Sequence, residues 1–413
     1  MQREYRIFTW LFITAFCLIY LYLFITSGTY LLHHSHNPLD FLAFYTGAQL
    51  VSRSPTELYN LHSQLILQQQ IDPLAKIHTG FLPFLNPPFV ALAFEILVNF
   101  GLENAYIVFL GINVILIVLI CFIAMQQLNK TKWYSILLLI IGIATFIPIL
   151  ITLLIGQLSI VLCIIFLLAW LSLKEGREFR TGFVLSLLLI KPHFLILPLL
   201  AMLVQRRINV IYGLMSGIVI LVSISYFYIG WSGISTYSML LTSFYKTGVG
   251  YNIDLMEQHS LQTLLLIIFH TQSPAVIRIP WIISIMCIIL PTLFIWSKKF
   301  SASSPQFSFQ FALLIIATLL TSPHTPIYDL SLLTIVSSLL LSQMNKFKHR
   351  QKVFLVVFIV LGYIISLIGY SLDILSHGQT QDSWIVFSVI YLVIFWLILL
   401  REFAGSKKLD IEY

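Results

Sequence analysis

The sequence predicts an all-α integral membrane protein built as a polytopic helical bundle. Of its 413 residues, 59% are hydrophobic and only 9% are charged, and the mean hydropathy is +0.95. A soluble domain carries about a quarter charged residues. A chain this poor in charge must therefore expose much of its surface to lipid. Its apolar runs are continuous rather than alternating, which favours helices over a membrane barrel.

The first apolar run covers residues 7–27 and follows two arginines, Arg3 and Arg6. No small-residue cleavage site follows it, so we interpret it as an uncleaved first span with a cytoplasmic N-terminus. Residues 28–85 then form the first extracytoplasmic loop. Within this loop, amphipathic patterning predicts helices lying on the surface near 41–52 and 57–70.

The rest of the chain predicts a series of membrane spans in a single domain covering 1–413. We expect about 11 to 13 transmembrane helices in all. The candidates after the first span are 86–100, 104–127, 133–152, 157–173, 181–204, 208–230, 279–297, 307–322, 326–343, 352–371 and 384–402. A second extracytoplasmic loop is expected at 231–278, with a short amphipathic helix near 258–270.

Two of these spans raise problems of topology. Residues 181–204 contain Lys191 and Pro192 in the middle, and a lysine at the bilayer centre costs about 2.5 to 3.5 kcal/mol. We therefore predict two shorter helices with an outer apex at Lys191-Pro192. Residues 86–100 are short, and a full crossing there would place Lys130 and Lys132 on the wrong side of the membrane.

The net charge of +7 reflects topology rather than a nucleic-acid partner. Most of the 23 lysines and arginines stand in short clusters between apolar runs, as the positive-inside rule produces. The four cysteines, Cys17, Cys121, Cys163 and Cys287, lie within apolar runs and have no partner at metal-ligand spacing. They are interpreted as small core hydrophobic residues rather than disulfides or zinc ligands.

Known catalytic motifs are missing from the sequence. It has no Asp-x-Asp pair of the kind that holds a divalent metal against a nucleotide-diphosphate sugar. It also has no phosphate-binding P-loop, no His-Glu-x-x-His and no Gly-x-Ser-x-Gly. A nucleotide hydrolase, a zinc protease or a serine hydrolase is therefore disfavoured, and we expect neither a metal nor a cofactor.

Several short motifs follow one another in a recognisable order. Residues 37–70, "NPLDFLAFYTGAQLVSRSPTELYNLHSQLILQQQ", and 81–94, "FLPFLNPPFVALAF", are followed by "GQLSIVL", "LLLIKPHFLILPLL" and "SPHTPIYDLSLL". In this order they resemble glycosyltransferase family 87 over residues 37–333. Asn60 and Asn86 depart from the Asp and Tyr that are usual in the family. Its members include polyprenyl-phosphate-mannose-dependent α-mannosyltransferases with the GT-C membrane fold.

The resemblance implies roles for particular residues. It makes Asp40 the general base of an inverting transfer, a reaction that needs one carboxylate to take the proton of the acceptor hydroxyl. The leaving phosphate needs positive charge or hydrogen-bond donors. The groups expected to supply them are Lys191, Arg278 and His324. Tyr45, Tyr59, Gln157 and His259 are expected to bind substrate, and Tyr328 and Asp329 to support the site from behind.

Each of these residues also has a purely structural interpretation. Asp40 could cap the helix at 41–52, and Lys191 could be a snorkelling lysine at a helix end. Arg278 could be an interfacial anchor, and the tyrosines could belong to the interfacial aromatic belt. His324 could be a helix-end histidine, and Asp329 could simply bond a neighbouring tyrosine or histidine.

The resulting hypothesis is transfer of a hexose, with mannose expected, from a polyprenyl-phosphate donor to an extracytoplasmic lipid or glycan acceptor. The expected location is a bacterial inner membrane of the cell envelope, with the active site on the extracytoplasmic side. Two alternatives stay open. One is a glycan polymerase or ligase that uses an undecaprenyl-diphosphate donor, and the other is a non-enzymatic membrane transport or assembly protein.

Overall fold

The computed structural model describes residues 39–71, 81–127, 140–247, 255–343, 349–376 and 380–405. Within these ranges every regular element is a helix and there is no β-strand, which confirms the all-α prediction. The predicted first span at 7–27, Cys17, Lys130 and Lys132 lie outside the described residues.

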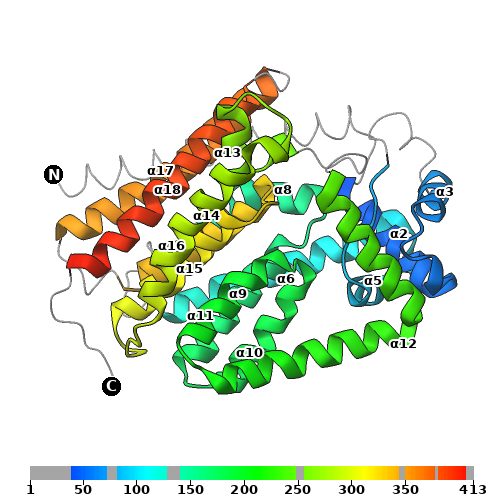
Figure 1. Ribbon diagram of the computed structural model, residues 1–413, viewed down its shortest axis with the longest axis horizontal. Helices are drawn as coiled ribbons and strands as arrows, with labels where there is room; N and C mark the ends of the chain where they lie inside the picture. The colour runs from blue at the N-terminus through cyan, green and yellow to red at the C-terminus, as the bar shows by residue number, and fades with distance from the viewer. Residues whose placement is uncertain are drawn as a thin grey trace.

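Figure 1 shows the arrangement of the described helices. Those that form the N-terminal half are α2 (Leu39–Arg53), α3 (Leu61–Ile71), α5 (Pro88–Glu95), α6 (Leu102–Gln127), α8 (Ile147–Ile155), α9 (Ser159–Lys174), α10 (Glu178–Ser186) and α11 (His193–Val204). The remainder are α12 (Ile208–Thr247), α13 (Leu261–Ile268), α14 (Pro274–Trp296), α15 (Pro305–Thr321), α16 (Leu333–Ser342), α17 (His349–Leu375) and α18 (Gln381–Gly405). Short 3₁₀ turns join some of them: η1 (Pro55–Glu57), η2 (Val98–Phe100), η3 (Leu187–Ile190), η4 (Leu255–Glu257) and η5 (Ile327–Leu332).

Long apolar helices identify a membrane protein. Among the described residues, five helices are long and apolar enough to cross a bilayer, and they belong to α6, α12, α14, α17 and α18. Their outer faces carry large apolar side chains, such as Ile115 on α6, which is 67% exposed. Such faces suit lipid rather than water. The expected total of spans and the GT-C fold stay predictions.

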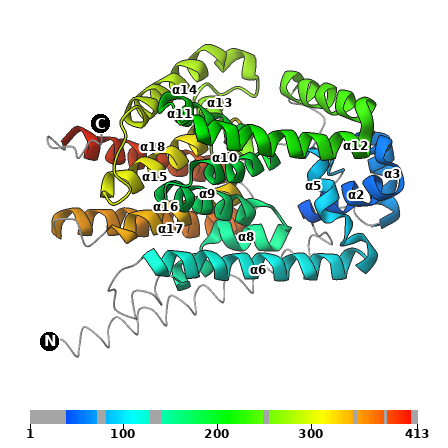
Figure 2. The ribbon, with the colours of Figure 1, turned by 90° about the horizontal axis from the view of Figure 1, so that it is seen from below.

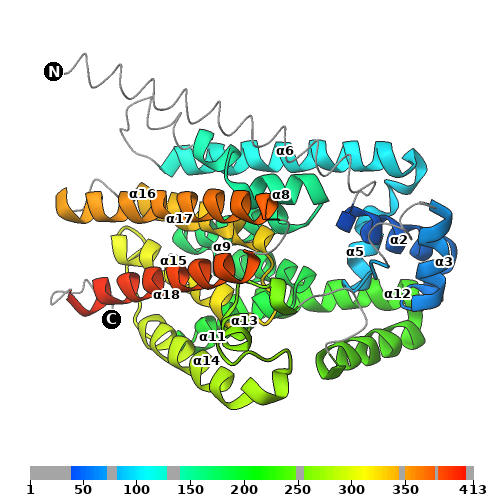
Figure 3. The ribbon, with the colours of Figure 1, turned by 90° about the horizontal axis from the view of Figure 1, so that it is seen from above.

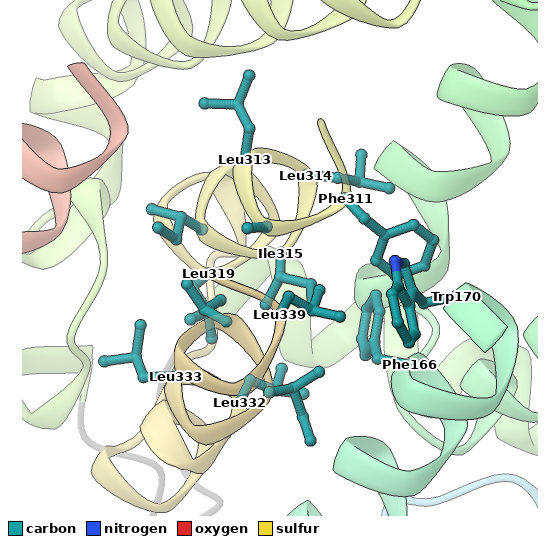
Figure 4. Packing of buried hydrophobic residues seen from close by; sticks show 14 of the residues in the cluster. Phe166, Trp170, Phe311, Leu313, Leu314, Ile315, Leu319, Leu332, Leu333 and Leu339 are labelled. Carbon is teal, nitrogen blue, oxygen red and sulfur yellow. The ribbon is translucent and has the colours of Figure 1, made fainter. Parts of the chain in front are cut away.

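The core of the bundle is built around α15. Almost every side chain of this helix is buried, as expected of a helix that is apolar on all sides. Its Phe311 packs beside Phe166 and Trp170 of α9, and its Ile315 lies beside Leu339 of α16 (Figure 4). Trp296 of α14 also packs against Phe311, with ring centroids 6.1 Å apart.

The N-terminal helices gather at one end of the molecule. There α2 packs on α3 and α5, and α12 runs from its contact with α10 to reach α5 and η1 (Figures 1 and 3). Figure 2 shows α6 and α12 on opposite sides of α9 and α10. The site described below lies where this end meets the bundle.

The prediction that the helix at 41–52 lies on the surface is wrong. Most of α2 is buried, because its aromatic residues pack inward. Phe44 stacks on Phe94 at a centroid distance of 5.1 Å, and Phe41 stacks on Phe109 at 5.4 Å. The predicted helix at 57–70 corresponds to η1 and α3.

The predicted span at 86–100 is also corrected. Its α-helix, α5, has eight residues and is followed by a 3₁₀ turn that ends at Gly101. Eight residues rise about 12 Å at 1.5 Å each, far less than the roughly 30 Å hydrocarbon layer. Because α5 does not cross by itself, the conflict over the side of Lys130 and Lys132 no longer arises from this segment.

The break predicted within 181–204 is confirmed. α10 ends at Ser186, η3 follows, and α11 begins at His193. Between them Lys191 has extended backbone angles, with φ −131° and ψ 87°, as the residue before a proline prefers. The lysine is buried, however, rather than standing at an exposed apex.

The predicted polar loop at 231–278 is largely helical. α12 passes through a break at Gly230, whose φ of 65° and ψ of −177° suit glycine alone, and continues to Thr247. The short helix expected near 258–270 is α13. α14 already begins at Pro274, so Arg278 lies within a helix instead of a loop.

Two smaller expectations are adjusted. The span expected at 133–152 is interrupted at Thr145-Phe146, after which α8 begins, and its first residues lie outside the described ranges. Cys121 and Cys163 are free and buried as expected, whereas Cys287 is exposed on α14.

Candidate active site

A cavity of about 620 Å³ joins segments that are distant in the sequence. Its walls come from the first turn of α2, the approach to α5, the α8–α9 connection, the break between α10 and α11, the segments before α13 and η5, and the facing ends of α17 and α18. Of the predicted site residues, it brings together Asp40, Gln157, Lys191, His259, His324 and Tyr328.

Asp40 lies in the first turn of α2, where the helix dipole favours a carboxylate. Gln157 Nε2 donates a hydrogen bond to Asp40 Oδ2 at 2.6 Å, and the same nitrogen lies 3.3 Å from the Tyr328 hydroxyl oxygen. Burial raises the pKa of Asp40 above its ordinary 3.8, whereas the bond from Gln157 and the charge of Lys191 lower it. The carboxylate is thus oriented by an amide and made more basic by its surroundings.

Gln157 is placed by the glycine before it. Gly156 ends α8 with a φ of 73°, in the left-handed region that favours glycine. Its α-carbon also packs closely on α2, because a Cβ added there would lie 2.6 Å from Phe41 Cβ. The Gly-Gln pair therefore brings the amide against the turn that carries Asp40.

Lys191 and Asp329 form a buried ion pair behind this turn. Lys191 Nζ lies 2.7 Å from Asp329 Oδ1 and 2.8 Å from Oδ2, and Ser159 Oγ donates to Oδ1 at 2.5 Å. The ammonium also lies 4.7 Å from the centroid of the Tyr328 ring. Asp329 therefore satisfies much of the lysine's charge, and its supporting role in the site stays a prediction. Lys191 is left with one further N–H.

Two histidines stand beside Lys191 in the cavity wall. The rings of His193 and His324 meet edge to face with centroids 6.1 Å apart. Among the described residues, His193 Nε2 and His324 Nδ1 are buried without a hydrogen-bond partner. Burial, with smaller contributions from Lys191 and His193, holds the pKa of His324 well below its usual 6.5. The imidazole of His324 is accordingly neutral.

His259 is fixed in one tautomer. Ser388 Oγ donates its proton to Ile385 O at 2.9 Å, so it accepts the 2.5 Å bond from His259 Nδ1. Burial lowers the pKa of His259 to about 3, so the ring is neutral and its Nε2 is a hydrogen-bond acceptor. The His259 ring also meets Trp384, with centroids 5.0 Å apart.

The cavity lining does not include four of the predicted site residues: Tyr45, Tyr59, Arg278 and Asp329. The Tyr45 hydroxyl donates to Val98 O at 3.1 Å, inside the N-terminal cluster. Arg278 is exposed on α14, because that helix begins earlier than expected and its outer face carries the side chain. The prediction that Arg278 binds the donor phosphate finds no support in this position.

Tyr59 does not line the cavity but is connected to its wall through Asn86. It stacks on Tyr237 with ring centroids 4.7 Å apart, and its hydroxyl donates to Asn86 O at 2.7 Å. Asn86 Nδ2 in turn donates to Ile190 O at 3.1 Å, next to Lys191. The Asn at this position, which departs from the family pattern, thus holds the break between α10 and α11.

The cavity also contains residues that the sequence did not single out: His193, Glu257, Asp373, Gln381 and Trp384. His193 could have been predicted from the sequence, because it directly follows the Lys191-Pro192 motif. The others had no signal in the sequence beyond their charge or aromatic type, because only tertiary packing brings α17 and α18 to this point. Among the described residues, no three His, Cys, Asp or Glu side chains are grouped as metal ligands would be.

The model of glycosyltransferase family 87 matches residues 84–323, more than half of the chain. The chain belongs to glycosyltransferase family 87. This membership makes it a membrane glycosyltransferase and sets aside the non-enzymatic alternative. The family match includes Gln157, Lys191 and His259, whereas Asp40 lies before it and Asp329 after it. No curated protein and no solved structure matches the chain.

Proposed function

We propose that this glycosyltransferase transfers a hexose, with mannose expected, from a polyprenyl phosphate to a lipid or glycan acceptor, and that Asp40 is the general base. The observation that carries the proposal is the Asp40 carboxylate. It is half-buried in the cavity wall, is held by Gln157 at 2.6 Å and shares the cavity with Lys191 and three histidines. The proposed side of the membrane is extracytoplasmic, since Asp40 follows the expected first span.

The reaction needs few groups. The acceptor oxygen attacks C1 of the sugar as the bond from C1 to the phosphate oxygen breaks, and the electron pair of that bond leaves with the phosphate. The proton of the acceptor hydroxyl passes to Asp40. A carboxyl whose pKa is raised by burial takes up that proton more readily than an ordinary aspartate. Attack from the face opposite the phosphate inverts the configuration at C1.

The leaving phosphate gains negative charge in this step. Lys191 keeps one N–H beyond its two bonds to Asp329, and His193 and His324 present imidazole nitrogens beside it. Donors already oriented toward developing charge stabilise a transition state without reorganisation. Lys191, His193 and His324 are therefore assigned to the donor phosphate, and the ion pair with Asp329 fixes the ammonium.

The apolar part of the cavity suits the polyprenyl chain. Leu82, Leu85 and Pro87 line it on the approach to α5, and Tyr237 and Leu241 line it from the second half of α12. This wall lies at the end of the molecule where α12 reaches α5. A lipid tail placed here would leave its phosphate toward the polar part of the cavity.

A diphosphate-linked donor is the second candidate. Such a donor brings more negative charge, and among the described lining residues Lys191 is the one side chain that is always cationic. The charge of the site therefore favours a single phosphate.

The donor class can be tested with the purified protein in nanodiscs. It would be given radiolabelled polyprenyl-phosphate mannose, polyprenyl-phosphate glucose and an undecaprenyl-diphosphate hexose, each with the same membrane extract as acceptor source. We expect product from a monophosphate donor and none from the diphosphate. Product from the diphosphate donor alone would contradict the proposal.

A further inference from the structure

The part of the cavity at α17 and α18 differs chemically from the part at Lys191. We call it the α17–α18 end, and it is formed by Glu257, His259, Asp373, Gln381 and Trp384. Trp384 connects these residues, because its ring lies 5.0 Å from that of His259 and 6.2 Å from that of Tyr370. Asp373 follows Tyr370 by three residues on α17 and therefore lies on the same side of the helix.

Hydrogen-bond acceptors predominate at this end. Glu257 and Asp373 contribute carboxylates, and the neutral His259 presents Nε2 because its Nδ1 proton is engaged by Ser388. Among the described residues, Asp373 Oδ1 is a buried oxygen without a partner. Gln381 adds an amide, and the aromatic rings add apolar surface. A matching ligand must bring several hydrogen-bond donors and must carry no negative charge.

We propose that the α17–α18 end binds the acceptor, and that the acceptor group held there is a neutral saccharide. This inference rests on the proposed function, because it names the substrate class for the second half of the same reaction. Sugar hydroxyls can donate to the unpartnered Asp373 Oδ1 and to His259 Nε2, and the apolar face of a pyranose packs against aromatic rings. One acceptor hydroxyl then reaches C1 of the donor sugar and gives its proton to Asp40.

The charge pattern also orients the two substrates. An anionic acceptor would meet two carboxylates at this end, whereas the donor phosphate meets Lys191 and two histidines elsewhere in the cavity. Like charges in a partly desolvated site repel strongly, because the low local dielectric enlarges their interaction. Tyr328 lines the same cavity, with its ring centroid 4.7 Å from Lys191 Nζ.

Equilibrium binding without any donor tests the inference. The purified full chain in nanodiscs would be titrated with radiolabelled pentyl hexoside, the corresponding pentyl hexuronide and the corresponding pentyl hexosaminide. We expect the uronide to bind at least tenfold more weakly than the neutral hexoside. In Asp373→Asn, which removes one negative charge and keeps the shape, this preference should fall below threefold.

Asp382→Asn is the matched control, because Asp382 is exposed on α18 and does not line the cavity. It should keep the full preference. Equal binding of uronide and hexoside to the unaltered protein, or no measurable binding of any of the three, would overturn the inference. Tenfold tighter binding of the hexosaminide would also overturn it, since it would indicate a site for amines. These outcomes are independent of donor use, so they leave the proposed transfer reaction to be tested separately.

Discussion

Lys191 and Asp329 are joined by a buried ion pair in which one ammonium nitrogen contacts both carboxylate oxygens, at 2.7 and 2.8 Å. The pair ties the break between α10 and α11 to the turn that precedes α16. Removing one partner leaves an uncompensated buried charge, which costs about 3 to 5 kcal/mol. The pair is thus a structural element as well as a source of positive charge for the phosphate.

Neutralising one partner should destabilise the protein more than neutralising both. We expect Lys191→Met and Asp329→Leu each to lower the melting temperature in detergent, and the double variant to regain most of the loss without regaining transfer activity. Lys299→Met, at an exposed site, should change neither the melting temperature nor the transfer activity. A double variant as unstable as the single ones would show that the ion pair is not the main role of these residues.

The amide of Gln157 should set the pH at which the enzyme becomes active. Asp40 must be ionised to accept a proton, so activity falls as the pH drops through its pKa, which burial places above 3.8. Because the bond from Gln157 lowers this pKa, Gln157→Leu should raise it and shift the acid limb of log(kcat/KM) to higher pH.

The same variant should reduce kcat about 10- to 100-fold, as expected when the group that orients a catalytic base is lost. The measurement is the pH profile of the two proteins with a monophosphate donor, and Gln70→Leu on the exposed face of α3 is the control. An acid limb that does not move would separate Gln157 from the titration of Asp40.

Gly156 should tolerate no side chain. Alanine at its φ of 73° costs about 1 to 2 kcal/mol, and its Cβ would meet Phe41 Cβ at 2.6 Å, so α2 must shift. Gly101 provides a matched control, because its φ is 75° but nothing lies within 4 Å of an added Cβ. We expect both alanine variants to lose stability and Gly156→Ala alone to lose transfer activity. Equal activity of the two variants would contradict the close approach of α2 to Gln157.

Substitutions of Arg278 and His324 should differ in their effect on activity, although the sequence analysis assigned both residues to the donor phosphate. His324→Ala removes an imidazole from the cavity wall and should lower kcat/KM about 10- to 100-fold. Arg278→Gln, on the exposed face of α14, should stay within about twofold of the unaltered enzyme because the side chain does not line the cavity. A large loss in Arg278→Gln would show that the arginine reaches the donor in some other way.

The sequence was most informative where a function depends on short motifs. Asp40, Gln157, Lys191 and His324 were predicted from their motifs, and the break at Lys191 was predicted from the cost of a lysine within an apolar run. The partner of that lysine is 138 residues away, and periodicity carries no information about such a contact.

The sequence-based predictions were wrong where the exposure of a side chain depends on where a helix begins or on how it packs. Arg278 was placed in a loop because its helix was expected to start at 279, whereas α14 begins at Pro274. α2 was expected on the surface because its polar residues suggested an amphipathic helix, yet aromatic packing buries it. The α17–α18 end could not be predicted, since α17 and α18 appeared in the sequence only as membrane spans.

Three carboxylates line the cavity among the described residues, Asp40, Glu257 and Asp373, and the account names the first as the base. The most direct test compares Asp40→Asn, Glu257→Gln and Asp373→Asn for transfer from a radiolabelled polyprenyl-phosphate hexose, with membrane insertion checked for each. We predict that Asp40→Asn loses transfer entirely, while the other two keep the reaction with weaker use of the acceptor. Full activity in Asp40→Asn, or complete loss in Glu257→Gln alone, would contradict the assignment of Asp40.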